Sequence, residues 1–207
     1  HNEHVIPFFI AAYYVQHLLF GNYYILYQIV SCITLALCAL TLCSLGLKLI
    51  KGSGLRAECA YLSAFVFTVS GLQSESVHWA ICQSTLFSLL FVLLSIMFGW
   101  DFLRDGRYRL LVLSLFFAAA APLFFGGAFV LPILFGSLLM FKWFREPSRA
   151  WRRRGLVLLL SLAAALVIPF LFYLAFRDGS GHSVSQVKIA AADELLGYVF
   201  IGAFFGA

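Results

Sequence analysis

Residues 23–47, YYILYQIVSCITLALCALTLCSLGL, form an apolar run that contains no Asp, Glu, Lys or Arg. An α-helix rises 1.5 Å per residue, so roughly 25 residues cover about 37 Å. The hydrocarbon layer of a bilayer is about 30 Å thick, which such a helix can cross. The stretch therefore predicts a transmembrane helix, and several later parts of the chain repeat its pattern.

Further apolar runs predict an all-α fold, a polytopic bundle with six transmembrane spans. The other five spans are expected at about residues 58–73, 78–100, 110–125, 128–144 and 155–176. A shorter run over residues 5–20, broken by Gly21-Asn22, predicts a helix lying in the membrane interface. Residues 195–207 resemble the start of a further helix. We expect a single transmembrane domain over residues 1–207, as a piece of a longer polytopic protein.

The composition excludes several other classes of protein. Hydrophobic residues make up 63% of the chain and charged residues 11%, whereas a soluble domain is about 25% charged. The net charge of +5 does not indicate nucleic-acid binding, because the Lys and Arg are scattered over short loops rather than gathered on one surface. The five Cys show no metal-ligand spacing and are interpreted as packing residues. No metal or other cofactor is predicted, and a divalent ion is left open.

The basic residues predict the orientation of the bundle, since cytoplasmic loops are enriched in Lys and Arg. With six spans, twelve of the 14 fall on one side: Lys48, Lys51, Arg56, Arg104, Arg107, Arg109, Lys142, Arg145, Arg149, Arg152, Arg153 and Arg154. Arg177 and Lys188 fall on the other. We therefore expect an integral protein of a bacterial inner membrane or an equivalent membrane, with the basic loops cytoplasmic.

Two polar stretches are expected on the exoplasmic side. The first is His1-Asn2-Glu3-His4, in which imidazoles flank a carboxylate that can accept a proton from a hydroxyl. The second is Ser74-Glu75-Ser76-Val77-His78-Trp79, followed by Gln83. In a helix Glu75, Trp79 and Gln83 recur on one face and can line a cavity wall. For the first stretch, the alternative interpretation is an ordinary polar loop. For the second stretch, it is a helix N-cap with an interfacial Trp.

The order of these stretches resembles the GT-C type glycosyltransferases, polytopic enzymes that use polyprenyl-phosphate sugars. The first stretch, with Ile6-Pro7-Phe8 and Leu19-Phe20-Gly21-Asn22 after it, is similar to their first exoplasmic loop. The second is similar to a segment written H-P-x-x-[ST]-E-x-V-x-W-x-x-x-[RQ]. Ser70-Gly71 stands where members tend to have His-Pro, and Gln83 where many have Arg. An Asp motif of the family would precede His1.

The resemblance implies transfer of a sugar from a polyprenyl-phosphate donor to the hydroxyl of an exoplasmic acceptor. Glu3 would be the catalytic base, or the partner of a base further upstream, with His4 beside it. The remaining candidates for substrate binding are Glu75, His78, Trp79, Gln83, Arg177 and Lys188. Of these, Gln83, Arg177 and Lys188 would, together with His4, contact the leaving phosphate.

Two other functions fit the same pattern of spans. One is a flippase or transporter for lipid-linked or small polar substrates. The absence of Asp, Glu, Lys and Arg from the middle of every predicted span argues against an ion-coupled transporter, because such proteins usually keep an ionisable residue near the midplane. The other is a non-catalytic subunit made of membrane helices.

Overall fold

A computed structural model of the chain describes residues 7–49, 55–69, 83–125, 128, 135–136 and 148–177. The longer elements are all helices: α1 (Pro7–Phe20), α2 (Tyr24–Leu49), α3 (Leu55–Val69), α5 (Gln83–Asp105), α6 (Tyr108–Phe124) and α8 (Arg149–Arg177). The chain divides into two compact units, residues 1–171 and residues 172–207. The first unit contains α1, α2, α3, α5, α6 and the greater part of α8.

Three of the described helices are long and apolar enough to cross a membrane, over Tyr24–Lys48, Gln83–Asp105 and Arg149–Leu171. The protein is therefore a membrane protein with an all-helical fold in its described part, in line with the composition. The predicted number of six spans is not supported. The predicted span over residues 128–144 and the final run over residues 195–207 lie almost wholly outside the described residues.

Two helices that lie at predicted spans are short for crossing a bilayer. Helix α3 has 15 residues and helix α6 has 17. At 1.5 Å per residue they extend over about 22 and 26 Å, less than the roughly 30 Å of a hydrocarbon layer. They are apolar helices packed beside longer ones.

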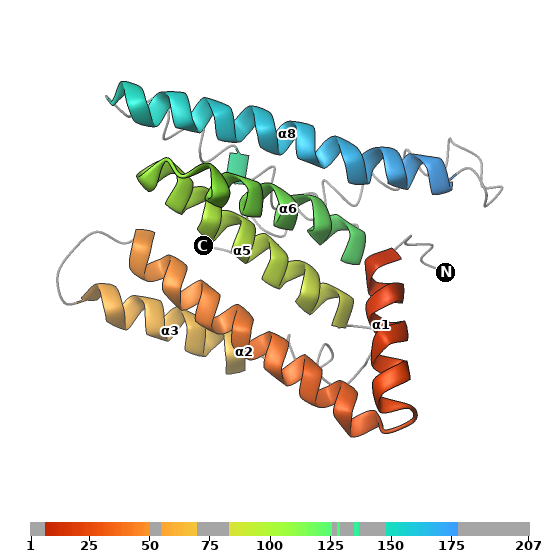
Figure 1. The fold of residues 1–207 in the computed structure, drawn as a ribbon. Coiled ribbons are helices and arrows are strands. Elements are labelled where there is room, and N and C mark those ends of the chain that lie inside the picture. The colour runs from red at the N-terminus through yellow and green to blue at the C-terminus, as the bar shows by residue number, and fades with distance from the viewer. Residues whose placement is uncertain are drawn as a thin grey trace, which may run out of the picture. The chain divides into compact units, whose positions relative to one another are not determined.

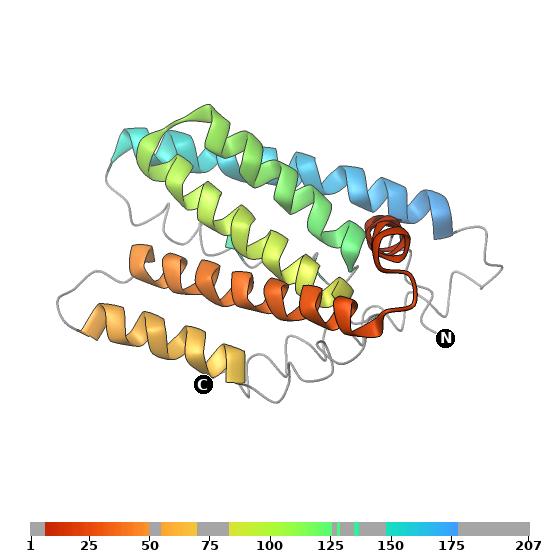
Figure 2. The same cartoon turned by 60° about the horizontal axis from the view of Figure 1, so that its bottom comes forward.

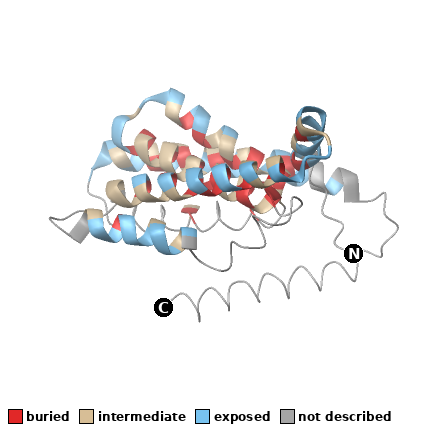
Figure 3. Ribbon diagram, turned by 90° about the horizontal axis from the view of Figure 1, so that it is seen from below, coloured by how far each residue is buried: buried red, intermediate tan, exposed pale blue. Residues whose placement is uncertain are grey.

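The described helices pack in the order α3, α2, α5, α6, with α8 against α5 and α6 (Figure 1). The core between α5, α6 and α8 includes Phe102, Leu111 and Leu158, all buried. Figure 3 shows buried residues gathered along α5, whereas most of α3 is exposed. Helix α5 is the central element, since it contacts α2, α6 and the core residues of α8.

Helix α1 lies crosswise to the longer helices, at the end of the bundle where α2 and α5 begin and α6 ends (Figures 1 and 2). It begins within the run predicted as an interfacial helix and ends at Gly21, which has a φ of +55°. The Gly21 N–H donates to the carbonyl of His17 at 2.8 Å. This is the αL helix stop that glycine adopts without steric cost.

A seam of small polar residues joins α5 to α6. The Ser114 hydroxyl donates to the carbonyl of Ser95 at 2.8 Å, and the Ser88 hydroxyl donates to the carbonyl of Ala121 at 2.9 Å. A Cβ atom on Gly99 would lie 3.0 Å from the Ser114 hydroxyl. Close approach of helices through Gly and Ser, with hydrogen bonds across the contact, is typical of packing inside membranes.

The opposite end of the bundle from α1 is where α2 and α5 finish and where α3, α6 and α8 start (Figure 1). We call it the basic end, because its helix termini carry Lys48, Arg56, Arg104, Arg107, Arg109, Arg149, Arg152, Arg153 and Arg154. Lys48 forms a 2.6 Å ion pair with Asp101, and Arg104 a 3.1 Å ion pair with Asp105. The basic residues of separate loops thus meet at one end of the described helices.

Arg154 closes the C-terminal end of α5. Its Nη1 donates to the carbonyls of Leu103 at 3.1 Å and Arg104 at 2.9 Å, while the N–H of Gly106 donates to the carbonyl of Phe102 at 2.7 Å. Carbonyls in the last turn of a helix have no partner within it, so these bonds satisfy three of them. A guanidinium also interacts favourably with the negative end of the helix dipole.

Gly106 and Gly21 provide a matched test of this helix stop. Both have positive φ, but a Cβ atom on Gly106 would lie 2.7 Å from the Arg154 guanidinium, whereas a Cβ atom on Gly21 would meet nothing within 4 Å. We expect Gly21→Ala to lower the free energy of unfolding by about 1 to 2 kcal/mol, the cost of left-handed backbone. Gly106→Ala is expected to cost more, because Arg154 must also move. SDS titration in mixed micelles measures both.

The control is Gly106→Ala in an Arg154→Ala background. Without the guanidinium the extra cost should disappear, leaving only the backbone penalty. Equal losses for Gly106→Ala and Gly21→Ala in the native background would contradict the assigned role of Arg154.

Candidate functional site

Tyr27 lies where α1, α2 and α5 meet, and its side chain is 4% exposed. Its ring packs against the rings of Tyr13 and Phe20 on α1, with centroids 5.5 and 5.6 Å apart. Its hydroxyl donates to the carbonyl of Gly21 at 3.0 Å. The Tyr27 ring therefore fixes α1 across the start of α2.

Gln83, the first residue of α5, binds the same residue from the other side. Its side chain is 1% exposed, and Nε2 donates to the carbonyl of Tyr27 at 2.6 Å. Its Oε1 is buried and accepts no hydrogen bond from the part of the chain that the structure describes. The amide is thus anchored by its nitrogen, with its oxygen still able to accept a bond.

Gln16 provides a second buried carboxamide. It lies three residues after Tyr13 and four before Phe20, so it is on the α1 face that packs on Tyr27. It is 7% exposed, and its Oε1 has no hydrogen-bond partner among the described residues. A buried polar atom without a partner costs about 1 to 3 kcal/mol, so two such oxygens at one junction are unusual.

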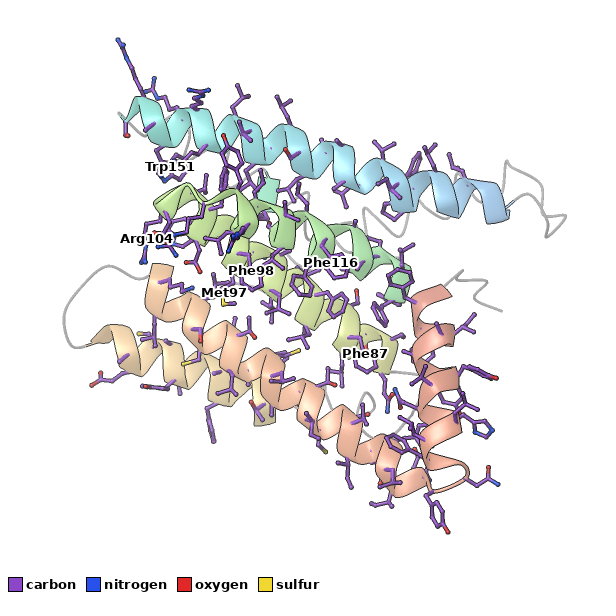
Figure 4. All side chains as sticks on the ribbon, in the orientation of Figure 1. Phe87, Met97, Phe98, Arg104, Phe116 and Trp151 are labelled. Carbon is purple, nitrogen blue, oxygen red and sulfur yellow. The ribbon has the colours of Figure 1, made fainter. Side chains whose placement is uncertain are left out.

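Aromatic rings surround this junction. Phe8 on α1 packs edge-on against Phe124 at the end of α6, with centroids 5.8 Å apart. Phe124 also contacts Phe87 and Phe91 of α5, at 5.5 and 5.0 Å. Figure 4 shows Phe87 near α1, at the end of α5 away from Arg104. We call this region, with Gln16, Tyr27 and Gln83, the aromatic end.

The aromatic end has the chemistry of a binding site for a neutral polar group. Apolar and aromatic walls with a few fixed polar atoms are typical of small-molecule sites. A carboxamide oxygen accepts a hydrogen bond from a hydroxyl or N–H group of a ligand. Within the described residues, no group of three His, Cys, Asp or Glu could hold a metal ion.

Of the residues that the sequence singled out, the structure places Gln83 in this site. Six others lie outside the described residues: Glu3, His4, Glu75, His78, Trp79 and Lys188. Arg177 is the last residue of α8, and its side chain is not described. Gln16 and Tyr27 were not predicted as site residues, although a glutamine inside the apolar run over residues 5–20 was a visible signal.

Comparisons with protein-family models, with curated proteins and with solved structures found no match.

Replacing Gln83 by Leu tests whether its amide is needed for packing. The substitution removes one hydrogen bond, but it also removes a buried oxygen that has no partner, at nearly constant volume. We expect the free energy of unfolding to change by less than about 1 kcal/mol, measured by SDS titration in mixed micelles. Gln83→Ala, which leaves a cavity, should cost about 2 kcal/mol or more. A large loss for Gln83→Leu would make the residue a structural one.

Proposed function

We propose that this chain belongs to the membrane domain of a glycosyltransferase of the GT-C type. The enzyme would transfer a sugar from a polyprenyl-phosphate donor to the hydroxyl of an exoplasmic acceptor. The observation that carries the proposal is the pair of buried carboxamide oxygens, those of Gln16 and Gln83, within the aromatic end. Sugar hydroxyls are the kind of donor that such oxygens accept.

Chain connectivity supports the proposal, because both polar stretches of the sequence join the helices that meet there. Glu3 and His4 shortly precede α1, which begins at Pro7 and packs on the end of α6 through Phe8. The stretch from Glu75 to Trp79 shortly precedes α5, which begins at Gln83. Residues of both stretches thus lie close in sequence to the aromatic end.

The orientation is part of the proposal. The basic end would face the cytoplasm, as Lys- and Arg-rich ends usually do, and the aromatic end would face the exoplasm. Helix α1, lying crosswise with exposed side chains such as Tyr14 and Leu18, has the orientation expected of a helix in the membrane interface. Aromatic residues are enriched at that depth of the bilayer.

In the proposed reaction the acceptor hydroxyl oxygen forms a bond to the anomeric carbon as the bond from that carbon to the phosphate oxygen breaks. Glu3 takes the hydroxyl proton, and polyprenyl phosphate leaves with the electron pair of the broken bond. The transition state has oxocarbenium character. Gln16 and Gln83 would bind sugar hydroxyls, while Glu75, His78, Trp79, Arg177 and Lys188, together with His4, would complete substrate binding.

Reconstituting the full-length protein in vesicles that contain radiolabelled polyprenyl-phosphate sugar distinguishes the candidate functions. The enzyme should release label from the lipid fraction when an acceptor is present. A flippase would move the label to the other leaflet while it stays on the lipid. A non-catalytic subunit would do neither, and either of these results would overturn the proposal.

Two substitutions locate the chemistry within the enzyme. Glu3→Gln should abolish release of the label without changing the unfolding midpoint, because the amide cannot take the proton. Gln83→Leu should raise the KM for the donor about three- to tenfold, because the variant loses one neutral hydrogen bond to the sugar. Gln28→Leu, the same change next to Tyr27 in sequence, is the matched control and should leave KM unchanged. Unchanged activity in Glu3→Gln would remove Glu3 from the mechanism.

A further inference from the structure

The basic end carries more positive charge than its acids neutralise. Asp101 pairs with Lys48, and Asp105 pairs with Arg104. Arg107, Arg109 and Arg153 are exposed and form no ion pair with a carboxylate of the described residues. Arg107 immediately precedes α6, Arg109 lies in its first turn, and Arg153 lies in the second turn of α8. The surplus is therefore located at two helix N-termini, where the helix dipole adds positive potential.

On α6 the exposed arginine continues into an apolar strip. Arg109 is followed on its own face, three, four and seven residues later, by Val112, Leu113 and Phe116. These side chains are 63%, 40% and 58% exposed. The same surface of one helix thus carries a cation at its N-terminal end and apolar side chains below it.

Helix α8 repeats the arrangement. Arg153 is followed on its face by Leu156 and Leu160, which are 48% and 65% exposed. Side chains on a helix lean toward its N-terminus, so both Arg109 and Arg153 extend away from the apolar strips. Figure 4 shows Trp151 at this end of α8 and Arg104 at the matching end of α5.

We propose that the N-terminal turns of α6 and α8 bind the headgroups of anionic phospholipids. Arg109 and Arg153 would pair with the phosphate, and the acyl chains would cover the strips of Val112, Leu113 and Phe116 and of Leu156 and Leu160. Charge complementarity selects the headgroup, since an anionic lipid meets unneutralised arginines whereas phosphatidylcholine brings a cation of its own. The apolar strips select a lipid over a soluble anion, because only a lipid provides both partners. The inference is independent of the proposed enzymatic activity.

Electron paramagnetic resonance of spin-labelled lipids tests the proposal. The full-length protein is placed in phosphatidylcholine vesicles with a trace of labelled phosphatidylglycerol or labelled phosphatidylcholine, and the motionally restricted fraction of each label is measured. The wild-type protein should restrict phosphatidylglycerol preferentially. In the double variant Arg109→Gln, Arg153→Gln, each lipid site loses one arginine. The preference for phosphatidylglycerol at each of these sites should therefore fall about fivefold. High salt should weaken the wild-type preference through screening.

Two controls make each result decisive. Arg109→Lys with Arg153→Lys keeps the charge and should retain most of the preference, which separates loss of charge from misfolding. Inorganic phosphate should displace the label no more than chloride does at equal ionic strength. Unchanged preference in the double glutamine variant, or specific displacement by phosphate, would overturn the proposal.

Discussion

The polar contacts of helix α5 are the constraint on which the rest of the described structure depends. At its start, Gln83 binds the carbonyl of Tyr27 on α2, and near its end Asp101 pairs with Lys48 on the same partner helix. Between these points Ser88 and Ser95 bond to α6. Contact between apolar side chains distinguishes helix neighbours poorly inside a bilayer, because lipid tails are equally apolar. Hydrogen bonds and ion pairs at fixed positions therefore favour one register of α5 against its neighbours, even where a single bond, such as that of Gln83, contributes little to the free energy of unfolding.

Arg154 shows how a residue counted as a loop charge can have a structural role. The sequence places it in a run of three arginines, Arg152 to Arg154, and its contribution to the orientation of the bundle was the only role that could be predicted. In the structure its guanidinium lies on the carbonyls that end α5, 50 and 51 residues earlier in the chain. Gly106 leaves room for it, because any Cβ at that position would meet the guanidinium. One residue thus links the start of α8 to the end of α5.

The long helices could be predicted from the sequence, whereas the contacts at their ends could not. An uninterrupted apolar run such as residues 23–47 specifies a helix almost by itself, since a backbone in lipid must satisfy its own hydrogen bonds. The runs at α3 and α6 were predicted as spans, but their helices of 15 and 17 residues are short for crossing a bilayer. Gln83 was predicted as a residue of a cavity wall, and its nitrogen is found on the Tyr27 carbonyl. That contact joins residues 56 positions apart, which periodicity along the chain cannot reveal.

The two ends of α5 have different chemistry, and this difference affects how deep the helix lies in a membrane. Its 23 residues form one continuous helix, which extends over about 35 Å. The end near Asp101 and Arg104 lies among charges that favour water and headgroups, while the end near Gln83 lies among aromatic rings and neutral amides. The cost of moving an arginine into hydrocarbon holds the first end at a membrane surface. Because the helix is stiff, holding that end also sets the depth of Gln83 and of the carboxamide oxygens around Tyr27. The charges at one end of α5 therefore fix the depth at which Gln83 and Tyr27 lie in a membrane.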